Sequence, residues 1–169
     1  MRMLRNIILA LIALAIAAVA GADCAVCVMH MQGEPRTMQH NPQYDDVALD
    51  VKAFLAARCA ALRAAGVAQE RILIDPGFGF GKTQAQNYAL LRRLAQARVQ
   101  PYPWLIGVSR KSMIGHVTGR SPTERVADSI AAALAAVARG AAVVRVHDVA
   151  ATRDALRVWQ AVEQGVQDG

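Results

Sequence analysis

Three polar clusters in this sequence each follow an apolar run, and their residue types could together bind a polar, anionic small molecule. Asp75 follows one run, Ser109 and Lys111 follow a second, and Arg145 and His147 follow a third. A carboxylate at the mouth of a buried strand is costly unless hydrogen-bond donors meet it, so the natural partner of Asp75 is a ligand with adjacent N–H groups. Arg145 offers a planar fork of donors and His147 a donor whose charge depends on pH, and this pair suits an anion.

The spacing within two of these clusters predicts that their side chains share a direction. Ser109 and Lys111 are two residues apart, as are Arg145 and His147, and residues two apart on an extended backbone face the same way. Simpler roles exist: Asp75 could cap the backbone amides that follow it, and Lys111 or Arg145 could be ordinary surface charges. We favour binding roles because these residues follow apolar runs rather than lying on a polar helix face.

The glycine-rich stretch after Asp75 matches a phosphate-binding loop only in part. Residues 79–83, Gly-Phe-Gly-Lys-Thr, end as a Walker motif ends, but the position five residues before Gly81 is Pro76 rather than glycine. The other apolar runs supply no convincing carboxylate partner for the magnesium ion of such a site. A nucleotide hydrolase is therefore disfavoured.

Four units, each an apolar run followed by a helix-like stretch, must position these residues. The expected elements are strands beginning near residues 25, 71, 104 and 142 and helices over residues 47–65, 84–98, 121–137 and 152–162. Asp46 can cap the first of these helices and Ser121 the third. Short apolar runs of this kind are typical of parallel strands buried on both faces. In alternating folds of this type, chemistry gathers at the carboxyl ends of the strands.

Length and composition limit the fold and the function. The chain has 169 residues, of which 54% are hydrophobic, enough for one α/β domain with a substantial core. Four units cannot close an eight-stranded barrel, which takes about 250 residues, so we expect either a small open sheet or half of a barrel. The net charge of +6 is scattered and only 5% of residues are aromatic. These values disfavour nucleic-acid binding and suit an anionic small substrate.

Residues 1–22 form a separate apolar segment before the domain expected over residues 23–169. A basic start, an uninterrupted apolar stretch from Ile7 to Ala20 and small residues at its end give a signal-peptide pattern. The same stretch could be an apolar N-terminal helix that ends at Gly21. We expect a cytoplasmic protein because its three cysteines form no disulfide pattern. Export or membrane tethering through residues 1–20 is the alternative.

Four motifs, taken together, closely resemble dihydropteroate synthase, the sulfonamide target of folate biosynthesis. They are Val28–Gly33, Asp75–Lys82, Gly107–Gly115 and Arg145–Val149, and they occur in the family's order. The family is an eight-stranded α/β barrel, and the motifs correspond to its last four strands. The resemblance therefore implies a partial, TIM-barrel-like (βα)4 half-barrel with parallel strands, extending from about Asp23 to the C-terminus.

The resemblance also implies a reaction and a set of site residues. The family joins 4-aminobenzoate to a dihydropterin that carries a methylene diphosphate, and diphosphate leaves as Mg2+ helps to carry its charge. By resemblance, the substrate-binding residues are Met29, Asp75, Gly79, Phe80, Gly107, Ser109, Lys111, Arg145 and His147. Among these, catalysis would fall to Lys111, Arg145 and His147.

Individual roles carry over where the motif matches. Asp75 would bind the 2-amino and ring N–H groups of the pterin, and Met29, Phe80 and Gly107 would wall its pocket. Lys111 would contact the pterin and shape the aminobenzoate site, with Ser109 near the benzoate. Arg145 and His147 would hold the diphosphate and stabilise charge as the carbon–oxygen bond breaks.

The family's first four strands have no counterpart here. They carry the asparagine associated with Mg2+, a second pterin-binding aspartate and the loops that complete the aminobenzoate site, so no residue of this chain is predicted to bind the metal. We therefore expect weak or no turnover unless another chain completes the barrel. The alternative function is a non-catalytic half-barrel that binds pterin or forms a homo-oligomer through its exposed sheet edges.

Overall fold

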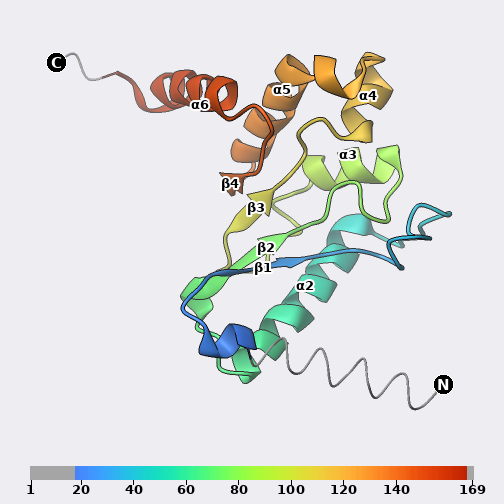
Figure 1. Ribbon diagram of the computed structural model, residues 1–169, viewed down its shortest axis with the longest axis vertical. Coiled ribbons are helices and arrows are strands. Elements are labelled where there is room, and N and C mark those ends of the chain that lie inside the picture. The colour runs from blue at the N-terminus through green and yellow to red at the C-terminus, as the bar shows by residue number, and fades with distance from the viewer. Residues whose placement is uncertain (1–17, 167–169) are drawn as a thin grey trace.

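The computed structural model describes residues 18–166 and shows four strands, each followed by one or more helices (Figure 1). In chain order the elements are β1 (Val26–Met29), α2 (Val47–Ala64), the short 3-10 helix η1 (Gln69–Arg71), β2 (Ile72–Asp75), α3 (Gln84–Arg92), β3 (Trp104–Ile106), α4 (Ser112–Thr118), the 3-10 helix η2 (Pro122–Glu124), α5 (Val126–Val137), β4 (Ala141–Val144) and α6 (Val149–Gln164). The four predicted strand–helix units are confirmed.

The strands form one parallel sheet in the order β1-β2-β3-β4. Residue pairs run in step from Val26 opposite Ile72 to Met29 opposite Asp75. Between β3 and β4 the register shifts once, next to Trp104. Because each strand lies beside its successor and points the same way, the carboxyl ends of all four strands meet at one edge. The prediction of a parallel (βα)4 half-barrel is confirmed.

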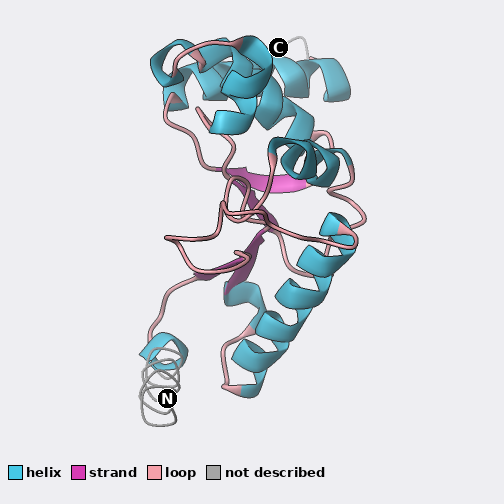
Figure 2. Ribbon diagram, turned by 90° about the vertical axis from the view of Figure 1, so that its right-hand side faces the viewer, coloured by secondary structure: helices cyan, strands magenta, loops and turns pink. Residues whose placement is uncertain are grey.

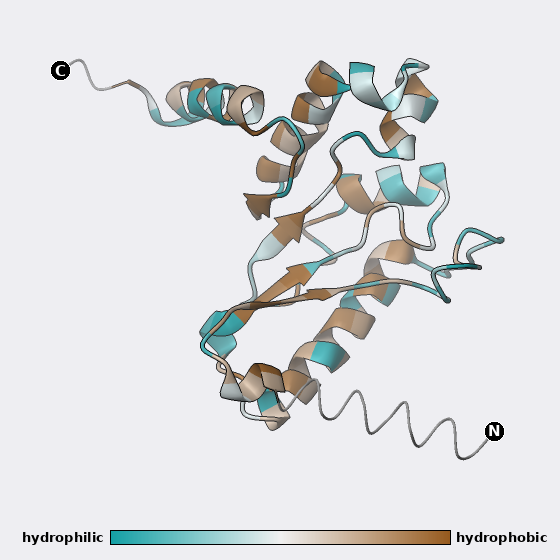
Figure 3. Cartoon of the chain, viewed as in Figure 1, coloured by the Kyte–Doolittle hydropathy of each residue, from teal (hydrophilic) through white to brown (hydrophobic). Residues whose placement is uncertain are grey.

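One face of this sheet is buried and the other is open. Ile72, Ile74, Trp104 and Ile106 are fully covered, and the helices pack against them. Residues of the opposite face are less covered, and Val143 on β4 is 41% exposed. Figure 2 shows helices to the right of the strands and above them, with loops to their left, and Figure 3 shows apolar residues concentrated in the strands and polar residues in the loop after β1.

Helix α2 supplies much of the packing under β1. Asp46 caps it, as predicted, by accepting hydrogen bonds from the backbone amides of Ala48 and Leu49 at 2.9 and 3.1 Å. Its buried side chains recur at helical spacing, among them Val51 and Leu55, which are both fully covered. This stripe places one face of the helix against the sheet.

The second predicted helix is shorter than expected. α3 ends at Arg92 rather than near residue 98, and the chain continues in tighter turns, as in the hydrogen bond from the Leu94 amide to the Leu91 carbonyl. Leu94 and Ala97 are fully buried in this stretch. Burial of these apolar side chains is therefore achieved without continuing the α-helix.

The third predicted helix is divided. Ser121 forms the predicted capping box, but around the 3-10 helix η2, and α5 begins only after Arg125. The Arg125 guanidinium donates to the carbonyl oxygens of Arg110 and Lys111 at 2.9 and 3.2 Å, and this contact lies at the division. Helix α4, just before, was not predicted. α6 begins at Val149, three residues earlier than expected.

The apolar segment predicted over residues 1–22 falls largely outside the described residues. Its last part, residues 18–21, is helical, as expected for a helix that ends at Gly21. Among the helices of residues 18–166, none has the length and apolar character needed to span a membrane.

We predict that Leu55→Ala lowers the free energy of unfolding by about 2–5 kcal/mol, because it leaves a cavity under the sheet. Leu49→Ala on the same helix is the control, since Leu49 is 53% exposed, and it should change stability by less than about 0.5 kcal/mol. Urea denaturation followed by circular dichroism measures both. Equal losses from the two variants would contradict this account of the core.

Candidate functional site

Side chains from three strand ends converge at the carboxyl edge of the sheet. An Arg145 guanidinium nitrogen lies 3.4 Å from a carboxylate oxygen of Asp75. The Lys111 ammonium donates to the carbonyl oxygen of Phe78 and lies 4.7 Å from the ring centroid of Phe80. The expectation that the carboxylate, the ammonium and the guanidinium share one location is therefore confirmed.

Asp75 ends β2 and is only 2% exposed. One carboxylate oxygen accepts a hydrogen bond from the backbone amide of Gly77 at 2.7 Å, as the capping role also predicted. Burial raises the pKa of Asp75 above its usual range, while the Gly77 amide and the charges of Lys111, Arg145 and Lys82 act in the opposite direction. The other oxygen faces the site, where it can accept further N–H donors.

The glycine loop after Asp75 packs directly against the chain that follows β1. Gly77 has a φ of +68°, and a Cβ placed there would overlap the carbonyl oxygen of His30. The adjacent Phe78 is fully buried. Beyond it, Gly79 lies against the Lys111 side chain, where a Cβ would come within 3.3 Å of Lys111 Cδ. Glycine at these positions lets the backbone approach both the β1 loop and the lysine.

Ser109 and His147 meet across the gap between the third and fourth units. The Ser109 hydroxyl lies 3.0 Å from His147 Nδ1. Together with Gly107, Lys111 and Arg145 they line a cavity of about 160 Å3. Two cations, a hydroxyl and an imidazole thus line the cavity, and this combination suits an anionic group.

Ser109 and Lys111 were predicted to face the same way because they would lie two residues apart on one strand, and this reason was wrong. β3 ends at Ile106, so Ser109 and Lys111 lie beyond the strand and are separated by a turn rather than by continuous extended backbone. Between them Arg110 has a φ of +58°. Its guanidinium pairs with Asp148 at 2.7 Å. This ion pair joins the loop after β3 to the loop after β4, and the turn at Arg110 sets the directions of its two neighbours.

Met29, Phe80 and Gly107, predicted to wall a pterin pocket, surround the same edge. Met29 is paired with Asp75 in the sheet register. Phe80 lies under the Lys111 ammonium, and a Cβ on Gly107 would come within 2.9 Å of the Arg145 guanidinium. The ligand contacts of these residues stay predictions, but all lie around the carboxylate that would hold the pterin.

Burial also affects the basic groups. Desolvation lowers the pKa of Lys111 to about 8, with Arg145 adding to the effect and Asp75 opposing it. Lys111 therefore keeps most of its charge at neutral pH but is closer to losing a proton than an exposed lysine.

Two buried polar residues that hold the glycine loop, Lys82 at its end and Asn87 on α3, were not predicted as site residues. Asn87, 1% exposed, accepts from the Gly79 amide at 2.8 Å and donates to the carbonyls of Lys82 and Thr83. Lys82 itself is 2% exposed. The position of Lys82 at the end of the glycine loop could have indicated a lysine that holds the loop. The partial Walker match of residues 79–83 instead suggested phosphate binding.

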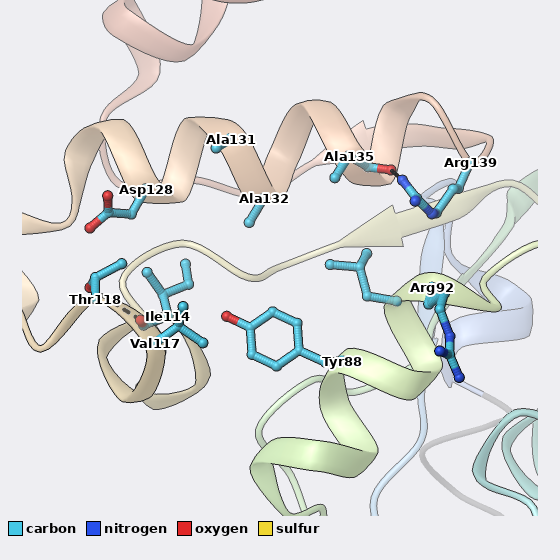
Figure 4. Close-up of a pocket in the computed structure, with 11 residues that line it drawn as sticks. Tyr88, Arg92, Ile114, Val117, Thr118, Asp128, Ala131, Ala132, Ala135 and Arg139 are labelled. Atoms are coloured by element: carbon cyan, nitrogen blue, oxygen red, sulfur yellow. Dashed lines mark hydrogen bonds between the residues drawn. The ribbon is translucent and has the colours of Figure 1, made fainter.

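A larger hollow of about 400 Å3 lies between α3, α4 and α5 (Figure 4). Tyr88 and Ile114 face Ala132 across this apolar hollow, with Asp128 near one end and Arg139 near the other (Figure 4). None of the predicted site residues contributes to it. We place the functional site at the strand ends, because the charged groups converge there.

A magnesium site is not formed by the residues that the structure describes. Across residues 18–166 there is no group of three or more histidine, cysteine, aspartate or glutamate side chains arranged to hold a metal ion. Two acidic side chains lie at the strand ends: Asp75 is surrounded by cations, and Asp148 is paired with Arg110. The described residues therefore do not fit a bound divalent metal ion.

Comparison with known proteins agrees with this geometry. Residues 13–147 match the family model described as pterin binding enzyme. The chain belongs to the pterin binding enzyme family. It is 57% identical over 145 residues to the dihydropteroate synthase of Neisseria meningitidis serogroup B, an alignment that covers 83% of this chain and 51% of that protein. With the Escherichia coli K12 dihydropteroate synthase it shares 48% identity over 147 residues, covering 87% and 52%.

Solved structures of pterin binding enzymes have the same fold over most of this chain. The Burkholderia cenocepacia dihydropteroate synthase complexed with 7,8-dihydropteroate superposes with a TM-score of 0.82 at 60% identity, covering 88% of this chain and 56% of that one. The Xanthomonas albilineans enzyme with 4-aminobenzoic acid gives 0.81 at 49% identity, covering 89% and 55%. The predicted resemblance is confirmed, and the chain spans about half the length of the curated relatives it matches.

The close approach of the glycine loop can be tested with two alanine substitutions. Gly77 and Gly66 both have positive φ, +68° and +89°, but only Gly77 faces a backbone atom. Each alanine should cost about 1–2 kcal/mol from backbone strain. Gly77→Ala should cost at least about 1 kcal/mol more, because the His30 carbonyl must move. Urea denaturation compares the two, and equal losses would refute the contact.

Proposed function

We propose that this chain carries the pterin- and diphosphate-binding half of a dihydropteroate synthase, which joins 4-aminobenzoate to a dihydropterin methyl diphosphate and releases diphosphate. The observation that supports this most is the meeting of Asp75, Lys111 and Arg145 at one edge of the sheet. The related structures with 7,8-dihydropteroate and 4-aminobenzoic acid add support, since they show such ligands on the same fold.

The chemistry of the site suits each part of this substrate. A buried carboxylate recognises two adjacent N–H groups, so Asp75 would accept from the pterin ring. Arg145 and His147 would stabilise negative charge on the departing diphosphate, which is what a displacement of this type requires. The arylamine is itself the nucleophile, so no residue has to form a covalent intermediate.

The whole reaction needs groups beyond this chain. The matched region covers about half of each relative's length. We propose that Mg2+ assists the complete enzyme, although the described residues offer no site for it. We expect this chain by itself to bind pterin but to catalyse the reaction weakly, because its four strands supply side chains from one half of a barrel only.

A homo-oligomer is a second proposal, favoured by the open face of the sheet. Parallel sheets are normally covered on both faces, whereas Val143 is 41% exposed here. β1 and β4 each have one unpaired edge among the described strands. A non-catalytic half-barrel that binds pterin or self-associates would use these features.

We propose a cytoplasmic location. Cys24, Cys27 and Cys59 are free thiols, and Cys24 and Cys27 are exposed. Exposed unpaired thiols are typical of a reducing compartment. The mass of the mature N-terminus distinguishes this from export through residues 1–20.

Calorimetry with 7,8-dihydropteroate tests the pterin site. Asp75→Asn should weaken binding roughly 10- to 100-fold, because a hydrogen bond to a charged group contributes about 1.5–3 kcal/mol. Arg153→Ala, at an exposed residue of α6 that pairs with Asp154, is the control and should leave binding unchanged. Unaltered affinity in Asp75→Asn would contradict the proposed site.

A turnover assay with both substrates and Mg2+, run alongside sedimentation, separates the two proposals. Binding without turnover favours the non-catalytic half-barrel. Near-normal turnover by a monomer would refute the view that the other half of the barrel is needed.

A further inference from the structure

Lys82 is a buried cation directly behind the glycine loop. Its side chain is 2% exposed. The ammonium donates to the carbonyl oxygens of Gly77 and Phe80 at 2.9 and 3.1 Å. It also lies 3.0 Å from Nδ1 of His30. The three N–H groups of the ammonium thus have three acceptors, two in the loop and one in the segment after β1.

The acceptor on His30 connects Lys82 to the first strand. His30 is 4% exposed, and its ring packs edge-on against Phe54 with centroids 4.9 Å apart. Burial and the charge of Lys82 lower the pKa of His30 to about 4, so the imidazole is neutral at pH 7 and Nδ1 can accept. The backbone amide of His30 donates to the Asp75 carbonyl at 2.9 Å. Lys82 and His30 therefore join the glycine loop to the strand end beside Asp75.

The charge of Lys82 needs an explanation beyond these hydrogen bonds. Lysine is almost never fully buried unless it is paired, and among the described residues no carboxylate lies within ion-pair distance of Lys82. The acidic group that favours its charged form is Asp75, whose own pKa Lys82 helps to lower. Lys111 and Arg145 also face Asp75, but both border the cavity where a ligand would occupy them.

We propose that Lys82 is a positioning residue of the pterin site: without touching the ligand, it fixes the loop from Gly77 to Phe80 and holds a positive charge behind the Asp75 strand end. This inference rests on the proposed function for its pterin readout. Its electrostatic part concerns Asp75 alone and does not need a ligand. Lys82 stays behind the loop, so its charge remains near Asp75 whether or not Lys111 and Arg145 engage a substrate.

The direction of the pH effect follows from the groups that surround each partner. Asp75 is faced by Lys111, Arg145 and Lys82 and by the thiol of Cys27, whose pKa it raises. Burial raises the pKa of Asp75, and the cations oppose that rise. Removing one of them must raise the pKa of Asp75 further. In a variant that lacks one of these cations, Asp75 should then become protonated at a higher pH than in the native chain. Once protonated, it can no longer accept two hydrogen bonds from a pterin.

Lys82 is itself affected by its surroundings. Desolvation lowers its pKa to about 7, opposed by Asp75 and assisted by Lys111. His30 and Tyr44 also lie close to it, with the Tyr44 ring centroid 6.0 Å from the ammonium. Tyr44 is neutral near pH 7, because burial raises its pKa to about 12. Lys82 is therefore increasingly protonated as the pH falls below 7.

The test is the titration of the Asp75 carboxyl carbon, followed by NMR in the full chain without ligand. Lys82→Met keeps the length of the side chain and removes its charge, and it should move the Asp75 midpoint upward by roughly one pH unit. Lys52→Met, an exposed lysine on α2, is the matched control and should leave the midpoint unchanged. Identical midpoints in the native chain and Lys82→Met would overturn the proposal.

A second readout is the affinity for 7,8-dihydropteroate, measured by calorimetry across the same pH range. In Lys82→Met the acid half-point of binding should rise with the Asp75 midpoint. Weaker binding at every pH with an unchanged half-point would show a purely structural role and overturn the proposal. If the native chain does not bind 7,8-dihydropteroate, the proposed function fails, and the ligand-free titration alone decides the role of Lys82.

A measurement on the native chain covers the case in which Lys82→Met does not fold. The Asp75 signal should show a second inflection near pH 7, where Lys82 loses its proton. The same inflection should appear in the signal of the Lys82 ammonium. A flat Asp75 signal through that range would overturn the proposal.

Discussion

The buried carboxylate of Asp75 is the constraint on which the rest of the site depends. It ends a strand whose preceding residues are core, so it is almost fully removed from water. A charge in that position is tolerable only if donors and cations surround it. The Gly77 amide, Lys111, Arg145 and Lys82 supply them from different segments. The loops that carry these groups are therefore held to one arrangement by electrostatics as well as by packing.

The parallel sheet makes this arrangement possible. Because β1 to β4 lie side by side in sequence order, residues that follow each strand arrive at one edge although they are far apart in the chain. The contact between Arg145 and Asp75 joins residues seventy positions apart. Short cross-links then fix the loops relative to one another, among them the pair of Arg110 with Asp148 and the bonds from Arg125 to the loop after β3.

The two faces of the sheet differ in burial. Residues on the helix side are fully covered, whereas Val143 and its neighbours on the other face are not. In the longer relatives the matching region is about half of the protein. A ligand bound at the strand ends of this chain alone would have protein on one side and solvent on the other.

The sequence by itself determined the fold class, the order of the units and the clusters that follow the strands, because apolar runs and caps such as Asp46 act over a few residues. The family resemblance added the candidate roles of Asp75, Lys111 and Arg145. Helix ends near residue 92 and at Arg125 could not be predicted, since long-range packing and hydrogen bonds occur there. Only the tertiary structure showed that Lys82 is buried behind the loop. Its acceptor on His30 lies fifty-two residues away, and no local pattern records a contact over that separation.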